Sequence, residues 1–282
     1  MIQLSRYQPT KFRLVKIDPL FTMFAIALHY GSIILLFPVL ALLYRSKNYS
    51  LPIIKQTVLN PIVLAACQMT LLTGLLATLI NCIMGVMLAW ILVQLRFPGK
   101  RLLDMSVDLP FALPTSVGGL TLMTVYSDQG WMGPVCTLLG LRIAFTQLGV
   151  LVAMIFVSLP FIIRTLQPVL SHIERDIEEA SWCLGASQWT TFWWVIFPSI
   201  SSSLLTGIAL SFSRAIGEYG SIVLVASNRP RKDLVISVLI FQRLEQYDYQ
   251  GAITIAVLVL IVSFCILLSI NSIQIWKQQW KK

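Results

Sequence analysis

Apolar residues in this chain are gathered into long blocks, and polar, charged segments separate one block from the next. Six blocks are about 20 residues or longer, enough to cross a hydrocarbon core of about 30 Å at a helical rise of about 1.5 Å per residue. The blocks are residues 20–43, 68–93, 106–126, 144–167, 199–226 and 251–272. The pattern predicts an all-α, polytopic membrane protein with six transmembrane helices and both termini on one side of the membrane.

Composition agrees with this pattern. Of the 282 residues, 57% are hydrophobic and 12% are charged, and the mean hydropathy is +0.80, which excludes an ordinary soluble domain. The net charge of +9 indicates no nucleic-acid partner, because the basic residues flank the apolar blocks and so fit membrane lipid. The five cysteines show no CxxC spacing, so we expect small buried apolar residues and no metal site.

The chain divides into a first span and a denser set of later spans. Residues 1–19 form a basic tail, and the block 20–43 is too long for the apolar part of a signal peptide, so we expect a retained first transmembrane helix. After a polar stretch, residues 66–270 form the predicted transport domain, and residues 273–282 form a C-terminal tail. Lysine and arginine favour the side that holds both tails, which places the tails in the cytoplasm or stroma.

A charged segment, residues 173–198, joins two of the apolar blocks. Its apolar residues recur at spacings of four, three and four: Ile173, Ile177, Ala180 and Leu184. This recurrence predicts one apolar stripe on a helix, with the carboxylates largely off the stripe. We expect Gly185 to take the left-handed conformation that ends a helix, and Pro198 to mark a boundary before the next span. On the pattern alone, the segment is also compatible with an ordinary connecting loop.

Proline and glycine interrupt the third apolar block. These residues and the hydroxyl side chains beside them are Pro110, Pro114, Thr115, Ser116, Gly118, Gly119, Thr121 and Thr124. Proline and glycine free backbone groups inside a membrane helix, which is tolerated where protein or a water-filled cavity satisfies those groups. Two interpretations stay open: helix N-termini and hydroxyls that line a pathway for an anion, or small residues that pack between helices.

Arg214 and Glu218 are an opposite-charge pair within or close to the fifth block. Their i, i+4 spacing lets the two side chains meet on one helical face. Charged residues in membranes are costly and usually face the protein interior or a pathway. The two residues are therefore either a pore-facing or gating pair, or a structural pair that locks the span.

Together these segments resemble the permease subunits of ABC importers. The loop with which those permeases dock into an ATPase subunit is matched by Glu179, Ala180, Ser181, Gly185 and Pro198, with Ser181 in place of the family's second alanine. The strings RFPGKRLLDMSVDLPFALPT, SRAIGEYGS and LEQYDYQGA resemble the sulfate/thiosulfate branch, and within it the T-type subunit. Molybdate permeases are similar around RAIGEYGS, whereas LEQYDYQGA favours sulfate. The resemblance covers residues 60–272.

The resemblance implies a type I ABC importer permease with several partners. A second sulfate permease subunit completes the translocation pathway, two copies of an ABC ATPase subunit drive transport, and a sulfate-binding protein delivers the anion. The candidates for pathway or gating residues are Pro114, Thr115, Ser116, Gly118, Gly119, Arg214 and Glu218. The chain lacks a GxxxxGK[ST] motif, so we expect a transport subunit with no enzyme activity and no cofactor, and ATP used by the partner.

Two other classes of protein fit parts of the sequence. Asp104 and Asp108 make a DxxxD pair, which in membrane prenyltransferases holds magnesium on a diphosphate, but those sites need a second acidic cluster. A simpler interpretation balances the pair with Arg96, Lys100 and Arg101 at a helix entry. A secondary anion transporter fits broken helices and a buried charge pair, but it has no use for the docking loop.

Scarce alanine and abundant isoleucine indicate an AT-rich genome. We therefore expect a multi-pass protein of the chloroplast (plastid) envelope, with the bacterial cytoplasmic membrane as the alternative. The sequence leaves the choice between sulfate and thiosulfate open, because the binding protein is expected to set the affinity.

Overall fold

The computed structural model describes residues 19–279, and this part of the chain is helical, without a strand. The chain separates into two compact units, Met1–Asn48 and Tyr49–Lys282. In the first unit, α1 (Pro19–Gly31) continues through a π-helical turn, η1 (Ser32–Leu36), into α2 (Phe37–Lys47). Thr22–Lys47 is one helix, long and apolar enough to cross a membrane, which confirms the first predicted span.

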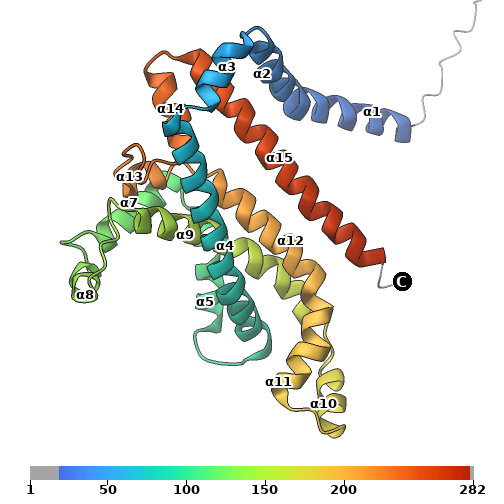
Figure 1. Cartoon of the computed structure of the whole chain (residues 1–282). Coiled ribbons are helices and arrows are strands. Elements are labelled where there is room, and N and C mark those ends of the chain that lie inside the picture. The colour runs from blue at the N-terminus through green and yellow to red at the C-terminus, as the bar shows by residue number, and fades with distance from the viewer. Residues whose placement is uncertain (1–18, 280–282) are drawn as a thin grey trace, which may run out of the picture. The chain divides into compact units, whose positions relative to one another are not determined.

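The second unit is built around four long helices (Figure 1). These are α4 (Pro61–Gln94), α9 (Gln147–Ser171), α12 (Phe197–Ile216) and α15 (Tyr249–Gln279). Helices α4, α9 and α12 pack against one another, and α15 packs against α12. Each of the four belongs to a stretch that is long and apolar enough to span a membrane, so five of the predicted spans are confirmed within the described residues.

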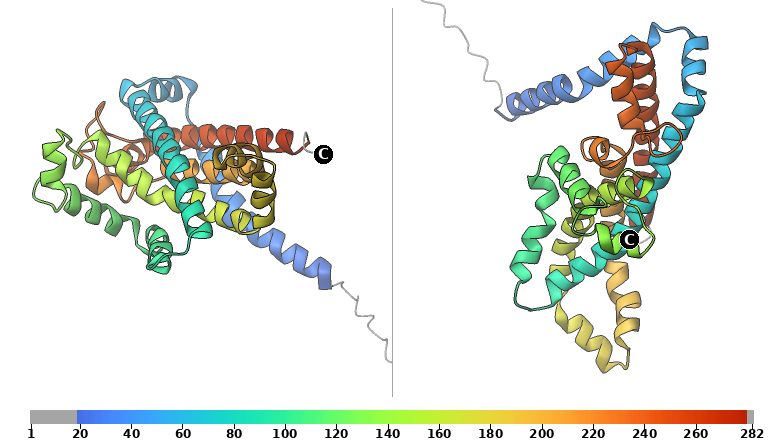
Figure 2. Two further views of the ribbon diagram at one scale, coloured as in Figure 1. Left: turned by 90° about the horizontal axis from the view of Figure 1, so that it is seen from below. Right: turned by 90° about the vertical axis from the view of Figure 1, so that its left-hand side faces the viewer.

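Shorter helices connect the long ones. They are α3 (Leu51–Val58), α5 (Lys100–Val107), α6 (Leu109–Ala112), α7 (Thr115–Tyr126), α8 (Gly133–Leu138), α10 (Arg175–Cys183), α11 (Gln188–Thr191), the π-helical turn η2 (Phe192–Ile196), α13 (Ile222–Val225) and α14 (Ile236–Glu245). Figure 1 and the right-hand view of Figure 2 both show α10 and α11 projecting together at one end of the second unit.

The third predicted block, residues 106–126, differs from the others because three short helices take the place of one long helix. Pro110 lies in the first turn of α6, where its missing N–H costs nothing, and Pro114 is the N-cap residue of α7. Leu113 is extended, with φ −89° and ψ 137°, as residues before proline commonly are. The interruption expected from these prolines is confirmed, and it leaves the N-terminus of α7 within the unit.

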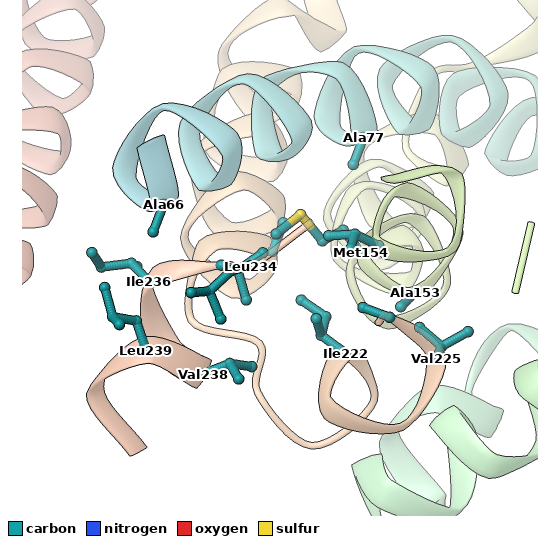
Figure 3. Packing of buried hydrophobic residues seen from close by; sticks show 14 of the residues in the cluster. Ala66, Ala77, Ala153, Met154, Ile222, Val225, Leu234, Ile236, Val238 and Leu239 are labelled. Carbon is teal, nitrogen blue, oxygen red and sulfur yellow. The ribbon is translucent and has the colours of Figure 1, made fainter. Parts of the chain in front are cut away.

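Buried apolar side chains form two clusters along α4 and α9. The first cluster includes Ala77 of α4, Met154 of α9 and Ile222 of α13 (Figure 3). The second cluster lies further along the same helices, around Ile162, and includes Val107 of α5. Small residues on α4 allow close approach of neighbouring helices, which is how membrane helices gain packing energy. The two clusters hold α13 beside one half of α9 and α5 beside the other half.

Candidate transport pathway and coupling site

Arg214 and Glu218 form the ion pair that their spacing predicts. Helix α12 ends at Ile216, so Arg214 lies in its last turn and Glu218 in the turn that follows. Arg214 Nη1 lies 2.8 Å from Glu218 Oε2, and the Glu218 side chain is only 1% exposed whereas that of Arg214 is 31% exposed. The carboxylate is therefore the buried partner, and the guanidinium extends from it toward the surface of the chain.

The rest of Glu218 is also bonded. Its Oε1 accepts a hydrogen bond from the backbone N–H of Ser221 at 2.8 Å. Its backbone carbonyl accepts one from the hydroxyl of Ser237, at the start of α14, at 2.7 Å. A buried carboxylate is tolerated when charge and hydrogen bonds compensate it, and Arg214 and the Ser221 N–H do so here. Glu218 thus fixes the turn between α12 and α13.

The N-terminus of α7 lies against this same turn. The Ser221 hydroxyl donates to the backbone carbonyl of Thr115 at 2.9 Å. A Cβ atom on Gly119 would lie 2.6 Å from Ser221 Cα, and one on Gly220 would overlap the Thr115 hydroxyl. The glycines therefore permit a close approach that side chains would block. The structure brings together the two groups of pathway candidates that the sequence presents about 100 residues apart.

The other members of the α7 group have different surroundings. Pro114 and Ser116 are exposed, and Gly118 is buried against Phe156 of α9, whose Cε1 a Cβ atom would approach to 3.2 Å. The Thr121 hydroxyl donates to the carbonyl of Val117 within α7. Gly118 and Gly119 thus pack between elements, while the first residues of α7 keep an exposed face. A role of these residues in a pathway stays a prediction.

The charged segment 173–198 begins as the predicted helix and turn. Helix α10 carries Asp176 and Glu178 in its first turn, where carboxylates favour the positive end of the helix dipole. Gly185 has φ +86°, which confirms the left-handed conformation expected of it. Ser187 then caps α11, accepting a hydrogen bond from the Thr190 N–H at 3.2 Å. The segment is a helical elbow.

The boundary expected at Pro198 is wrong. The helix runs without a break from Gln188 to Ile216, through the π-helical turn η2. The Phe197 N–H donates to the Phe192 carbonyl, five residues back, and Pro198 has no N–H to place in the ladder. The wider turn accommodates the proline, so the helix continues where a break was expected.

The predicted apolar stripe of α10 is largely uncovered by the rest of the chain. Ile173 packs against the second apolar cluster, but Ile177 and Ala180 are exposed and Leu184 is 90% exposed. Trp189 on α11 is 71% exposed beside it. Exposed apolar patches of this kind, rimmed by charged residues, are typical of surfaces that bind another protein or a membrane.

A cleft of about 880 Å³ lies between the elbow and the end of α4. Trp182, Trp189 and Glu179 line it, together with Glu178, whose carboxylate accepts a hydrogen bond from Gln94 at 3.3 Å. Burial raises the pKa of Glu178 above its ordinary value, and the charge of Arg175 opposes that shift. With its aromatic walls and carboxylates, the cleft suits an inserted protein segment carrying both apolar and basic side chains.

Arg164 is the functional candidate that sequence reasoning missed. It lies on α9 and forms ion pairs with Asp104 at 2.7 Å and Asp108 at 2.6 Å. Asp104 accepts further hydrogen bonds, and those from Gln167 and Arg164 lower its pKa. The expected balance by Arg96, Lys100 and Arg101 is therefore wrong about the main partner, although Lys100 adds a small favourable charge. A charge inside an apolar block was the available signal.

The same geometry removes the basis for a magnesium site at the DxxxD pair. Both carboxylates are bound to one guanidinium, which competes directly with a cation. Among the described residues, no group of three or more His, Cys, Asp or Glu side chains is placed to hold a metal ion. Asp104 and Asp108 thus serve as ligands of Arg164.

A second cavity lies at the end of α9 opposite the elbow. It measures about 710 Å³, and its charged lining residues are Arg142, Arg229, Lys232 and Asp233. The Asp233 carboxylate is buried and accepts hydrogen bonds from the N–H groups of Ser227 and Arg229 and from the Ser227 hydroxyl. Arg142 is paired with Asp128 at 3.2 Å, whereas Arg229 and Lys232 are exposed, so the cavity keeps a small excess of positive charge.

A family model described as "Binding-protein-dependent transport system inner membrane component" matches residues 81–278. The chain belongs to this family. The match includes the elbow, α9 and the Arg214–Glu218 pair. Membership confirms the resemblance to importer permeases and shows that the chain is a membrane transport subunit.

Relatives in the family support the sulfate branch. The chain is 61% identical over 273 residues to the "Probable sulfate transport system permease protein cysT" of Marchantia polymorpha, covering 97% of this chain and 92% of that protein. It is 53% identical over 251 residues to the "Sulfate transport system permease protein CysT" of Synechocystis sp., covering 89% and 88%. The resemblance to this branch is confirmed.

Solved structures agree on the fold. One is a bacterial ABC transporter involved in the import of the acidic polysaccharide alginate, with a TM-score of 0.75 at 17% identity over 90% of this chain and 94% of that chain. Another is the MetNI methionine ABC transporter, with a TM-score of 0.58 at 18% identity over 80% and 98%. At these identities they show the fold alone, which confirms an all-α permease of the type I importer class.

Proposed function

We propose that this chain is a permease subunit of an ATP-driven sulfate importer. It works with a second permease subunit, two copies of an ATPase subunit and an extracytoplasmic sulfate-binding protein, and it hydrolyses no ATP itself. The observation that carries the proposal is similarity along nearly the whole chain to proteins named as sulfate transport permeases.

The two ends of α9 suit different partners. At one end, the elbow offers exposed apolar side chains and the carboxylate of Glu179 beside a wide cleft, which fits docking of the ATPase. At the other end, the exposed side chains of Arg229 and Lys232 give the cavity an excess of positive charge, which fits arrival of a divalent anion from its binding protein. Helix α9 has 25 residues, so these ends lie about 37 Å apart. That separation is sufficient to span a membrane.

The turn around Glu218 is the proposed gate between these ends. The partly exposed guanidinium of Arg214 is paired with the Glu218 carboxylate, and Ser221 in the same turn bonds to Thr115, the first residue of α7, where backbone N–H groups favour an anion. A dianion that reaches this turn meets a guanidinium that is already paired, which attracts it less strongly than a cluster of free arginines.

We place the complex in the plastid envelope. Plant and algal relatives, among them the Marchantia polymorpha protein, support this location. The similar Synechocystis protein keeps the bacterial cytoplasmic membrane as the alternative. Detection of the chain in isolated envelope membranes would test the choice, and its recovery only with bacterial membranes would contradict it.

Reconstitution of the complete complex in liposomes tests the transport function. We expect uptake of radioactive sulfate that requires ATP, the ATPase subunit and the binding protein, and that thiosulfate reduces more than molybdate does. Uptake without the ATPase subunit would instead indicate a secondary transporter. Preferred uptake of molybdate would show that the transported oxyanion is molybdate and not sulfate.

Variants of the elbow test its docking role. Glu179→Ala and Gly185→Val should each abolish uptake while the protein stays in the membrane. Glu174→Ala is the matched control for the carboxylate, because Glu174 is exposed in the same segment and lies outside the cleft. Gly140→Val controls for the glycine, since Gly140 also has a positive φ, +68°, and open space around it. Equal loss in the controls and the elbow variants would contradict the docking role.

A further inference from the structure

Arg164 connects α9, the helix that leads into the elbow, to the segment that runs from α5 to α7. On α9 it precedes the helix end at Ser171 by about two turns, and α10 begins shortly afterwards at Arg175. Its partners Asp104 and Asp108 lie on α5 and in the turn that connects α5 to α6. A single side chain therefore connects the helix that leads into the elbow with the segment that leads into α7.

All five N–H donors of this guanidinium are used. Nε and Nη2 donate to the two carboxylate oxygens of Asp108 at 2.7 and 2.6 Å. Nη1 donates to Asp104 Oδ1 at 2.7 Å and to Gln167 Oε1 at 2.6 Å, and Nη2 also donates to the Asp104 backbone carbonyl at 2.8 Å. Gln167 closes the network by donating to Asp104 at 3.0 Å. We call these four residues the clamp.

Helix α5 makes only a small apolar contact with α9. Val107 is its one buried residue, Leu103 is partly buried against the same apolar cluster, and Leu102 and Met105 are 69% and 55% exposed. Phe111 of α6 adds one edge-to-face contact with Phe161 of α9, with ring centroids 5.1 Å apart. The position of α5 relative to α9 therefore depends on directional polar bonds more than on a packed apolar interface.

The backbone of α9 has gaps on both sides of the clamp. Pro160 and Pro168 each lie four residues from Arg164 inside the helix. Each proline removes one i→i−4 hydrogen bond and so weakens the helix at that point. The short stretch between the two prolines contains Arg164 and Gln167. It is held by backbone hydrogen bonds within α9 and also by the side-chain bonds to α5.

We propose that Arg164 is a positioning residue that passes movement of the elbow to the α5–α7 segment. The elbow moves α9, the clamp moves α5 with it, and the N-terminus of α7 moves the turn at Ser221 through its bond to Thr115. The clamp thereby links ATP hydrolysis to the state of the Arg214–Glu218 gate. This inference rests on the proposed function, because it takes the elbow as the ATPase docking site.

The test compares sulfate imported with ATP hydrolysed by the complete complex in liposomes. In Arg164→Met we expect ATP hydrolysis close to the parent's, while the sulfate imported per ATP falls about tenfold, within the usual range of coupling between sites. Arg164→Lys keeps the charge but not the planar fork, and should fall less. A proportional loss of both activities, with an unchanged ratio, would overturn the inference and leave a structural role.

Two further variants remove the effect of unpaired charge and of poor folding. The triple variant Arg164→Met, Asp104→Asn, Asp108→Asn has no orphaned carboxylate, and it should still have the low ratio of the single variant. A parental ratio in the triple variant would overturn the inference. Asp108→Asn preserves shape, and is the variant to measure should Arg164→Met fail to assemble. It should lower the ratio, and an unchanged ratio would overturn the inference.

A spectroscopic measurement separates this inference from the proposed function, because it needs no substrate. Spin labels at Leu102 on α5 and at Glu174, which is in the elbow segment but outside the cleft, occupy exposed positions. In the parent both labels should respond to ATP binding, whereas in Arg164→Met the label at Glu174 should respond and that at Leu102 should not. Response at both positions in the variant would overturn the clamp. Failure of the parent to import sulfate would instead overturn the proposed function.

Discussion

Two arginines of this protein meet carboxylates in different ways. Arg164 faces two aspartates whose side chains are 42% and 49% exposed. All its N–H groups donate hydrogen bonds to these aspartates and to Gln167. Arg214 faces a single glutamate that is 1% exposed. The first site contains one more negative than positive charge and is open, whereas the second is balanced and closed around the carboxylate.

The difference shows at which site removal of the arginine costs more folding free energy. At Arg164, loss of the arginine leaves carboxylates that water can reach, so the loss of folding free energy is small. At Arg214, the same loss leaves a buried charge with no compensating cation, which is the costly case. We therefore expect the Arg214 pair to matter most for stability and the Arg164 clamp to matter most for the linkage between helices.

The largest effect should follow Arg214→Leu. We expect the free energy of unfolding to fall by about 3–5 kcal/mol, because Glu218 stays buried without its partner. Thermal unfolding of the purified protein in detergent measures this. Adding Glu218→Leu should recover much of the stability but not sulfate uptake, since the positive charge beside the pathway is still absent. Uptake by the double variant near the parent's rate would make the pair purely structural.

A second, smaller effect should follow Gly119→Ala. The added Cβ atom would lie 2.6 Å from Ser221 Cα, so the turn that holds Glu218 must shift. Overpacking of this kind costs about 1–3 kcal/mol. Gly31→Ala is the matched control, because nothing lies within 4 Å of a Cβ atom there. Equal melting temperatures for the two variants would show that the Glu218 turn is not tightly seated.

A third effect concerns the open site. Arg164→Met should lower the free energy of unfolding by about 1 kcal/mol, because half-exposed ion pairs contribute little and the aspartates regain water. The same thermal measurement gives the value. A loss larger than that of Arg214→Leu would reverse the ranking of the two sites and would show that Asp104 and Asp108 are effectively shielded from solvent in the membrane.

The smallest effect is a pH dependence. Gln167 and Arg164 hold the pKa of Asp104 below its ordinary value of 3.8. A carboxyl whose pKa is depressed on folding contributes stability above its unfolded pKa, and loses it as the pH falls through the folded value. The parent should therefore lose stability below pH 3.8 faster than Asp104→Asn does. Parallel acid melting curves would contradict the bonding of Asp104 in the folded protein.

The sequence predicts local features of this protein well. Five of the six apolar blocks identify long helices, because a membrane span needs both length and low charge, and the block 106–126 is the exception. The Arg214–Glu218 pair follows from its i, i+4 spacing, and Gly185 from the backbone geometry that closes a helix. Each of these depends on residues that are close together along the chain, and the structure agrees with each.

Features that depend on distant residues could not be predicted in the same way. Asp104 and Asp108 lie nearly 60 residues before Arg164, and nothing in either segment specifies the other. The meeting of Thr115 with Ser221 likewise depends on how α7 and α13 pack together. The boundary predicted at Pro198 failed for a local reason, because a π-helical turn lets the helix continue past the proline.

That continuous helix, Gln188–Ile216, has a mechanical consequence. Its 29 residues make a rod about 43 Å long, with Trp189 in the cleft at one end and Arg214 at the other. Because the helix continues through η2, movement at the cleft is passed along it toward Arg214, and the π-helical turn with Pro198 is the point at which this helix bends most easily. The extra residue of the π-helical turn also rotates the distal face by about 100° about the rod axis. The π-helical turn thereby determines the side of the helix on which Arg214 lies.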